Sequence, residues 1–198
     1  MEQLMRILSL PRSRVYYHTA EEMHFKIAVT LHASRVERWI LAIKRDFLDA
    51  APIKCVCLGC EFSDPCEGRY NKCAAILQLS GPTETLVFQI CWADEVPQLL
   101  KDFLQDKTIR FCGTTIHKDV EMLCSYKIDI PSAFDLQKIT PNPTKFPILS
   151  LYDLANSIIG TKLEKKRRKR DKKKDNEEEE ENKLIFGWDN VPLSYEQV

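Results

Sequence analysis

The sequence reads VCLGCEF over residues 56–62 and FCGTTIHKD over residues 111–119, and these two stretches decide the fold. Each is an apolar, strand-like run that ends by presenting a carboxylate, Glu61 in the first and Asp119 in the second. Carboxylates at neighbouring strand ends suit a hard divalent cation, which needs oxygen ligands and can support phosphoryl transfer. The residue two positions before Glu61 shares its strand face, and it is Gly59, which supplies no ligand. The pattern predicts a cation site at the edge of a sheet with one carboxylate missing.

Apolar periodicity divides the rest of the chain into strands and helices. We expect the first helix to begin with a capping box formed by Ser34 and Glu37, and the last to bury a face with Leu151, Leu154 and Ile158. Short turns between the early strands indicate an antiparallel meander, and the later alternation with helices indicates parallel strands. The predicted fold class is α/β, a mixed sheet flanked by helices. The expected strands are residues 24–31, 53–62, 73–79, 86–90, 109–113 and 134–136, and the expected helices are residues 34–48, 95–104, 117–125 and 149–159.

Composition indicates one domain with charged appendages. The chain has 198 residues, 44% of them hydrophobic, and its formal net charge of zero does not by itself indicate a nucleic-acid binder. Residues 162–174 hold ten Lys or Arg against two acids, and residues 177–181 are all Glu. Such blocks predict a disordered, solvated segment. The predicted organisation is a poorly ordered extension over residues 1–22, a domain over 23–160, a charged insertion over 161–182 and the domain's C-terminal part over 183–198.

The insertion contains an unbroken basic run. Its members are Lys165, Lys166, Arg167, Arg168, Lys169 and Arg170. Such a run is typical of a nuclear localisation signal or of a loop that contacts nucleic-acid phosphates. The alternative is a solvated loop whose positive half pairs with the glutamates of residues 177–181. If the run binds nucleic acid, the binding should depend strongly on salt.

The cysteines are eight in number, and five of them lie between residues 55 and 73. They lack the paired spacing of zinc sites, and Cys55 and Cys57 lie in an apolar strand, so we expect small buried hydrophobes with reduced thiols. A zinc site in this cluster is the alternative. No stretch is apolar for long enough to span a membrane, and the N-terminus lacks the core of a secretory signal. We expect a soluble intracellular protein without a membrane partner, with an organelle transit peptide as the alternative.

Four segments, in this order along the chain, resemble the DEDD family of 3′–5′ exonucleases, in particular the Werner-syndrome-like exonucleases of plants. Residues 56–62 are similar to the first motif, a hydrophobic residue followed by Asp-x-Glu-aromatic. Residues 111–123 are similar to the second motif, in which a glycine precedes an aspartate and a leucine. Residues 74–79 resemble the run ATLQL, and residues 188–198, with Leu-Ser-x-Glu-Gln-Val, resemble the lead-in to the third motif. The resemblance covers residues 24–198, nearly the whole globular part.

The resemblance implies an RNase H-like fold that hydrolyses nucleic-acid 3′ ends with two divalent metals, Mg or Mn. It implies that Glu61 and Asp119 are catalytic carboxylates that bind metal. Gly59 stands where the family has an aspartate that bridges both metals. The resemblance therefore implies a nucleic-acid partner but an incomplete set of metal ligands.

The last residues resemble the capped start of a helix, with Ser194 as N-cap and Gln197 reaching back. The third motif would fall just beyond Val198, so we expect a truncated ancestral domain. Together with Gly59, this predicts weak or absent nuclease activity. The alternative is a non-catalytic pseudo-exonuclease that binds nucleic acid or a protein, such as an intact paralogue, in the nucleus or the cytoplasm.

Three residues near these motifs carry structural predictions. Trp92 should pack in the core rather than serve as a platform for stacked bases. His117 should be an exposed first-turn residue rather than a phosphate ligand. Asp135 should be structural, because family members do not bind metal at the matching position.

Overall fold

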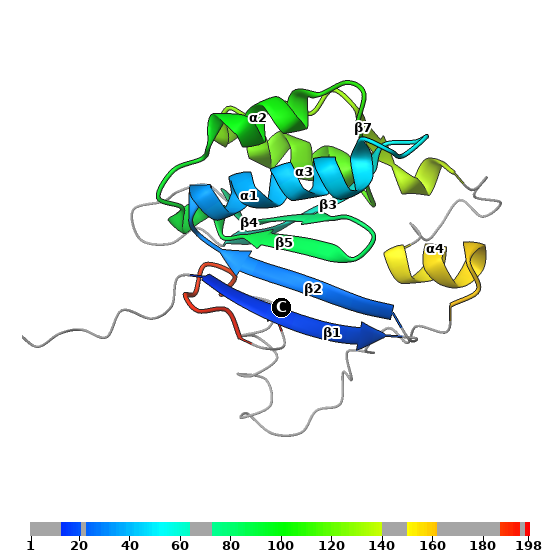
Figure 1. The fold of residues 1–198 in the computed structure, drawn as a ribbon, viewed down its shortest axis with the longest axis horizontal. Coiled ribbons are helices and arrows are strands. Elements are labelled where there is room, and N and C mark those ends of the chain that lie inside the picture. The colour runs from blue at the N-terminus through cyan, green and yellow to red at the C-terminus, as the bar shows by residue number, and fades with distance from the viewer. Residues whose placement is uncertain (1–12, 21–22, 64–72, 140–149, 162–186, 195–196) are drawn as a thin grey trace, which may run out of the picture.

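The computed structural model describes residues 13–20, 23–63, 73–139, 150–161, 187–194 and 197–198. They form a mixed sheet with helices packed against it (Figure 1). The strands are β1 (Ser13–Ala20), β2 (Met23–Thr30), β3 (Cys55–Ser63), β4 (Cys73–Ser80), β5 (Glu84–Phe88), β6 (Arg110–Gly113) and β7 (Ala133–Asp135). The helices are α1 (Ala33–Ile43), which continues as a π-helical turn over Lys44–Leu48, α2 (Gln98–Gln105), α3 (Ile116–Leu123) and α4 (Leu151–Ile158).

The sheet combines antiparallel and parallel pairs in the order β1-β2-β5-β4-β3-β6-β7. Strands β3, β4 and β5 pair antiparallel in succession, which confirms the predicted meander. β2 pairs with β5, β6 with β3 and β7 with β6 in parallel, whereas β1 runs antiparallel to β2. Strands β2, β5, β3, β6 and β7 therefore point the same way, and their C-terminal ends lie along one edge of the sheet. We call this the C-terminal edge.

The main core lies between the sheet and helices α1, α2 and α3, which cover the same face of it in Figure 1. Each helix buries residues at helical spacing. The rings of Phe103 and Phe111 meet edge to face, with centroids 5.5 Å apart. A smaller cluster that includes Val87 covers the opposite face. The residues before and after Val87 on β5 belong to the main core, and successive strand residues point to opposite faces, so Val87 points away from it. The residues of α1, α2 and α3 in the main core are Val36, Trp39, Ile40, Ile43, Leu100, Phe103, Leu104, Ile116 and Leu123.

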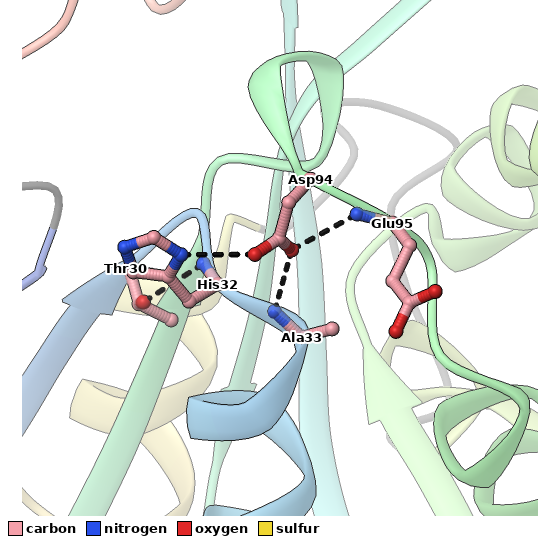
Figure 2. Close-up of polar contacts among 5 residues, drawn as sticks. All are labelled: Thr30, His32, Ala33, Asp94 and Glu95. Atoms are coloured by element: carbon pink, nitrogen blue, oxygen red, sulfur yellow. Dashed lines mark hydrogen bonds and ion pairs between the residues drawn. The ribbon is translucent and has the colours of Figure 1, made fainter.

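The start of α1 is held by Asp94, which comes from the segment after β5 (Figure 2). Its Oδ1 accepts hydrogen bonds from the backbone N–H groups of Ala33 at 2.8 Å and Glu95 at 2.9 Å. Its Oδ2 lies 2.9 Å from Nδ1 of His32. Partial burial favours the neutral form of Asp94, but the hydrogen bonds outweigh it and lower the pKa of this carboxyl. A charged carboxylate thus caps the helix and ties its first turn to the C-terminal edge.

Two predictions near the N-terminus are wrong. The capping box of Ser34 and Glu37 does not form, because α1 begins at Ala33 and the Asp94 carboxylate caps it. The expected poorly ordered extension is contradicted for residues 13–20, which form β1 and pair with β2 along their whole length. β1 therefore satisfies the backbone groups on one side of β2, which would otherwise be an open edge.

Helix α4 buries less of its surface than its periodicity predicts. Only Leu154 is buried, whereas Leu151 and Ile158 are exposed. Farther along, the backbone N–H of Ser194 donates to the Gln197 side chain at 3.0 Å, as the predicted cap requires. Apart from its first residue, the insertion predicted over residues 161–182 lies outside the described residues. Within the described part of the chain, every helix is too short or too polar to cross a lipid bilayer.

Candidate metal-binding site

Glu61 and Asp119 lie on neighbouring elements at the C-terminal edge. Glu61 is close to the end of β3, and Asp119 lies in the first turn of α3, which follows β6. β3 and β6 are parallel neighbours, and α3 packs against both β3 and β4. Both side chains are half-buried. The fold therefore brings together the two carboxylates that the sequence singles out.

The two carboxylates repel each other in a partly desolvated place. Burial, followed by the negative charge of Glu61, raises the pKa of Asp119 to about 7. Burial also raises the pKa of Glu61. The thiol of Cys60 has its pKa raised by burial and by both carboxylates, so it stays protonated. This arrangement favours a bound proton or cation, because either one relieves the repulsion.

The backbone before Asp119 is fixed by unusual local geometry. Thr115 precedes α3 in the left-handed conformation, with φ 58° and ψ 28°, which is rare for a β-branched residue. Its N–H donates to Oδ1 of Asp135 at 3.4 Å, and the same oxygen accepts the Gln137 N–H at 3.0 Å. Asp135 is therefore structural, as predicted. A Cβ on Gly113 would lie 2.6 Å from the Leu58 carbonyl oxygen, so β6 approaches β3 only because this residue is glycine.

Gly59 leaves room for a side chain on the strand face that carries Glu61. It shares a strand face with Glu61, and a Cβ at this position would meet only Oε1 of Gln78, at 3.8 Å. In the described ranges there is no group of three or more His, Cys, Asp or Glu side chains arranged to hold a metal ion. Two carboxylates suit one weakly held hard cation. The donors among the described residues therefore do not fit a two-metal centre.

Comparison with known protein families shows which family the chain belongs to. A family model described as 3′-5′ exonuclease matches residues 42–185, most of the chain. The chain belongs to this 3′-5′ exonuclease family. Comparison with curated proteins found no significant match.

Solved exonuclease structures resemble this family member in fold. The catalytic core of RRP6 from Trypanosoma brucei, a C496S mutant, has a TM-score of 0.60 at 16% identity, and Escherichia coli RNase D has 0.59 at 15%. Each match covers 85% of this chain but only 40% and 38% of those chains. The Nibbler EXO domain of Aedes aegypti has a TM-score of 0.57 at 13% identity, over 85% of this chain and 77% of that one. The likeness confirms the RNase H-like mixed sheet.

Other predictions for this exonuclease-family chain have mixed outcomes. His117 is exposed, as expected, but Trp92 is 52% exposed and its indole N–H donates to the Asp189 carbonyl, so its assignment to the core is wrong. The zinc alternative finds no support among the described cysteines. The basic run at residues 165–170 lies outside the described residues, so its role stays a prediction. Sequence reasoning missed that Cys55 contacts Cys112, because no spacing rule links cysteines 57 residues apart.

Asp119→Asn is expected to stabilise the metal-free exonuclease domain at neutral pH. The pKa of Asp119 is raised to about 7, whereas an aspartate in an unfolded chain ionises near ~3.9. The unfolded chain therefore releases this proton first, and the free energy of unfolding falls as pH rises between about 4 and 7. Allowing for solvent screening of a half-exposed group, asparagine should raise the free energy of unfolding by about 1–2 kcal/mol at pH 8 and by less at pH 4.5. Urea unfolding in EDTA measures both values.

Glu121→Gln is the matched control for this prediction, because Glu121 is an exposed acid on the same helix. It should change the free energy of unfolding little at either pH. An equal gain in both variants, or a gain for Asp119→Asn that does not change with pH, would contradict a raised pKa as the cause.

Proposed function

We propose that this member of the 3′-5′ exonuclease family binds nucleic acid and hydrolyses it weakly or not at all. One observation carries the proposal: β3 has Gly59 at the position that shares a face with Glu61, where a Cβ would meet only the Gln78 side chain. A two-metal site needs a ligand that reaches both cations about 4 Å apart, and glycine offers none. Glu61 and Asp119 remain as ligands for a single cation.

Mg²⁺ or Mn²⁺ is the proposed cation, because both prefer oxygen ligands. Such an ion, when bound, polarises a phosphoryl oxygen or a water molecule. Glu61 and Asp119 would hold it, and Asp119 must first lose the proton that its raised pKa retains near neutrality. Cys60 offers only soft sulfur with a raised pKa, so it does not replace the missing carboxylate.

A nuclease assay tests the proposal directly. The substrates are 5′-labelled single-stranded and 3′-recessed oligonucleotides, as DNA and as RNA, with Mg²⁺ or Mn²⁺ and with an EDTA control. We expect little or no 3′-end trimming above the EDTA control. Any residual trimming should fall at least about tenfold in Glu61→Ala and in Asp119→Ala, because each removes a metal ligand. Glu121→Ala should leave it unchanged. Robust, EDTA-sensitive trimming by the unmodified chain would overturn the proposed loss of activity.

A second candidate function is a non-catalytic module that binds a protein, such as an intact paralogue. The favouring observation is the apolar exposure at α4, where Leu151 is 56%, Ile158 49% and Ile159 72% exposed. Absence of nucleic-acid binding by the unmodified chain would favour this candidate. Comigration of the purified chain with a family member in size-exclusion chromatography would support it, and independent elution would count against it.

The same basic run supports a proposed location in the nucleus, with a cytoplasmic pool. Clusters of six successive Lys or Arg residues are read by nuclear import factors. Imaging a fluorescent fusion with and without residues 165–170 tests this location, and an unchanged distribution would contradict it.

A further inference from the structure

Three cysteines gather on the face of the sheet that also carries Gly59 and Glu61, but nearer the N-terminal end of β3. Cys55 and Cys57 lie on β3 and share a strand face, and Cys112 lies on β6. The Sγ atoms of Cys55 and Cys112 are 3.2 Å apart, and the parallel register sets Cys57 directly opposite Cys112. All three are free thiols. The Cys112 thiol therefore contacts the Cys55 thiol, and Cys57 lies directly opposite Cys112 on β3.

The three thiols differ in access to solvent. Cys112 is only 6% exposed and Cys55 is intermediate, whereas Cys57 is exposed. Burial, together with the neighbouring cysteines, raises the pKa of Cys57 and raises that of Cys112 to about 12. Thiols in such an environment react slowly, because the thiolate is the nucleophile. Cys57 and Cys112 therefore lack the low pKa of a fast peroxidase, and a reagent from solvent meets Cys57 first.

We propose that Cys55, Cys57 and Cys112 form an oxidation site, in which a hydroperoxide entering at Cys57 converts Cys55 and Cys112 into an intramolecular disulfide. The two sulfur atoms must approach from 3.2 Å to roughly 2.0 Å. Cys55 pairs with Arg110 and Cys112 with Cys57, so the bond joins a diagonal pair and also requires β3 and β6 to shift slightly against each other. The site would form its disulfide during sustained exposure to an oxidant.

The reaction balances in three steps. The hydroperoxide oxidises the Cys57 thiol to a sulfenic acid and is itself reduced to an alcohol, or to water if it is hydrogen peroxide. The Cys112 thiol attacks the Cys57 sulfur, which forms a Cys57–Cys112 disulfide and releases water. The Cys55 thiol then attacks the Cys112 sulfur, and the Cys57 sulfur leaves and regains its proton. Two thiols have lost two electrons and two protons to one hydroperoxide.

The Cys55–Cys112 disulfide would link the two strands that lead to Glu61 and Asp119. It would join β3, which carries Glu61, to β6, which leads through Gly113 into α3. The disulfide would link two residues that are 57 positions apart and fix the two strands against each other. Oxidation should therefore raise the unfolding temperature, and a thiol reductant should reverse the rise.

Mass spectrometry of the full chain tests the proposal. After treatment with hydrogen peroxide, quenching of free thiols with an alkylating reagent and digestion with trypsin, peptides 55–69 and 111–118 should be linked, with fragment ions placing the bond at Cys55 and Cys112. Intact mass should fall by two hydrogens, and dithiothreitol should restore it. Unlinked, fully alkylated peptides from folded protein after prolonged oxidation would overturn the proposal, as would a disulfide between two chains.

Serine variants separate the roles of the three thiols. Cys112→Ser should abolish the link, whereas Cys57→Ser should slow its formation at least about tenfold and leave the final bond unchanged. Cys124→Ser is the matched control, because Cys124 is an exposed cysteine on another element, and it should not change the rate. An unchanged rate in Cys57→Ser would overturn the entry role of Cys57. Thermal unfolding of each reduced variant confirms that it is folded, and the result on the unmodified chain stands without the variants.

Discussion

Replacing residues 165–170 with alanine is expected to weaken binding to single-stranded DNA or RNA by about 10²–10³-fold near 0.1 M salt. The reason is that six Lys or Arg side chains are lost, and each phosphate contact releases condensed counterions when it forms. The slope of log affinity against log salt should become shallower in the variant. Fluorescence anisotropy of a labelled oligonucleotide at several salt concentrations measures affinity and slope together.

Replacing the acidic run is a control that should change nucleic-acid affinity in the opposite direction. Replacing the five glutamates of residues 177–181 with glutamine removes charges that compete for the same basic side chains, so affinity should rise. If the alanine variant binds as tightly as the unmodified chain, the basic run is not the nucleic-acid contact. That result would place the nucleic-acid contact on another surface of this family member.

Gly59→Asp is expected to increase affinity for Mn²⁺ by about 10–100-fold, by analogy with the losses seen when supporting residues of metal sites are removed. The added carboxylate would stand on the same strand face as Glu61, beside the cation that Glu61 and Asp119 are proposed to hold. The structure has room for it, since the nearest atom to a Cβ at this position is Oε1 of Gln78 at 3.8 Å. Isothermal titration with Mn²⁺ measures the affinity, and the unfolding temperature in Mn²⁺ should rise in parallel.

Gly59→Asn is the matched control, because it adds the same volume with a neutral amide in place of the charge. It should increase Mn²⁺ affinity much less than aspartate does. Equal affinity for Gly59→Asp and the unmodified chain would show that the vacant place beside Glu61 is not part of the cation site. It would also remove the main argument for impaired hydrolysis.

The sequence predicts the elements whose residues alternate or repeat within a short window. The structure contains β3, β6 and α3 as expected, and it brings Glu61 close to Asp119. This proximity was predictable because the end of a strand and the start of the helix that follows a neighbouring strand lie at the same edge of a sheet. β1 was missed, since both Val15 and Tyr17 are exposed and an edge strand shows little burial pattern. Its assignment depends on pairing with β2, which no local pattern encodes.

The remaining misses arise from contacts between distant parts of the chain. The carboxylate of Asp94 takes the capping role that local pattern gave to Ser34, and it does so across 61 residues. Trp92 was expected in the core from its apolar side chain, yet its indole lies at the surface and bonds the backbone of Asp189, 97 residues away. The raised pKa of Asp119 likewise depends on burial and on Glu61, neither of which is visible in its own segment.

The cap on α1 also bears on the order in which the chain folds. During synthesis, residues 33–43 leave the ribosome long before Asp94 does, so the first turn of α1 emerges without the carboxylate that will hold it. The cap forms only when the segment after β5 reaches the end of β2, which requires β2 and β5 to pair across the intervening chain. Contacts of high sequence separation form slowly. Although α1 lies early in the chain, its first turn should therefore be among the later parts to gain protection from hydrogen exchange.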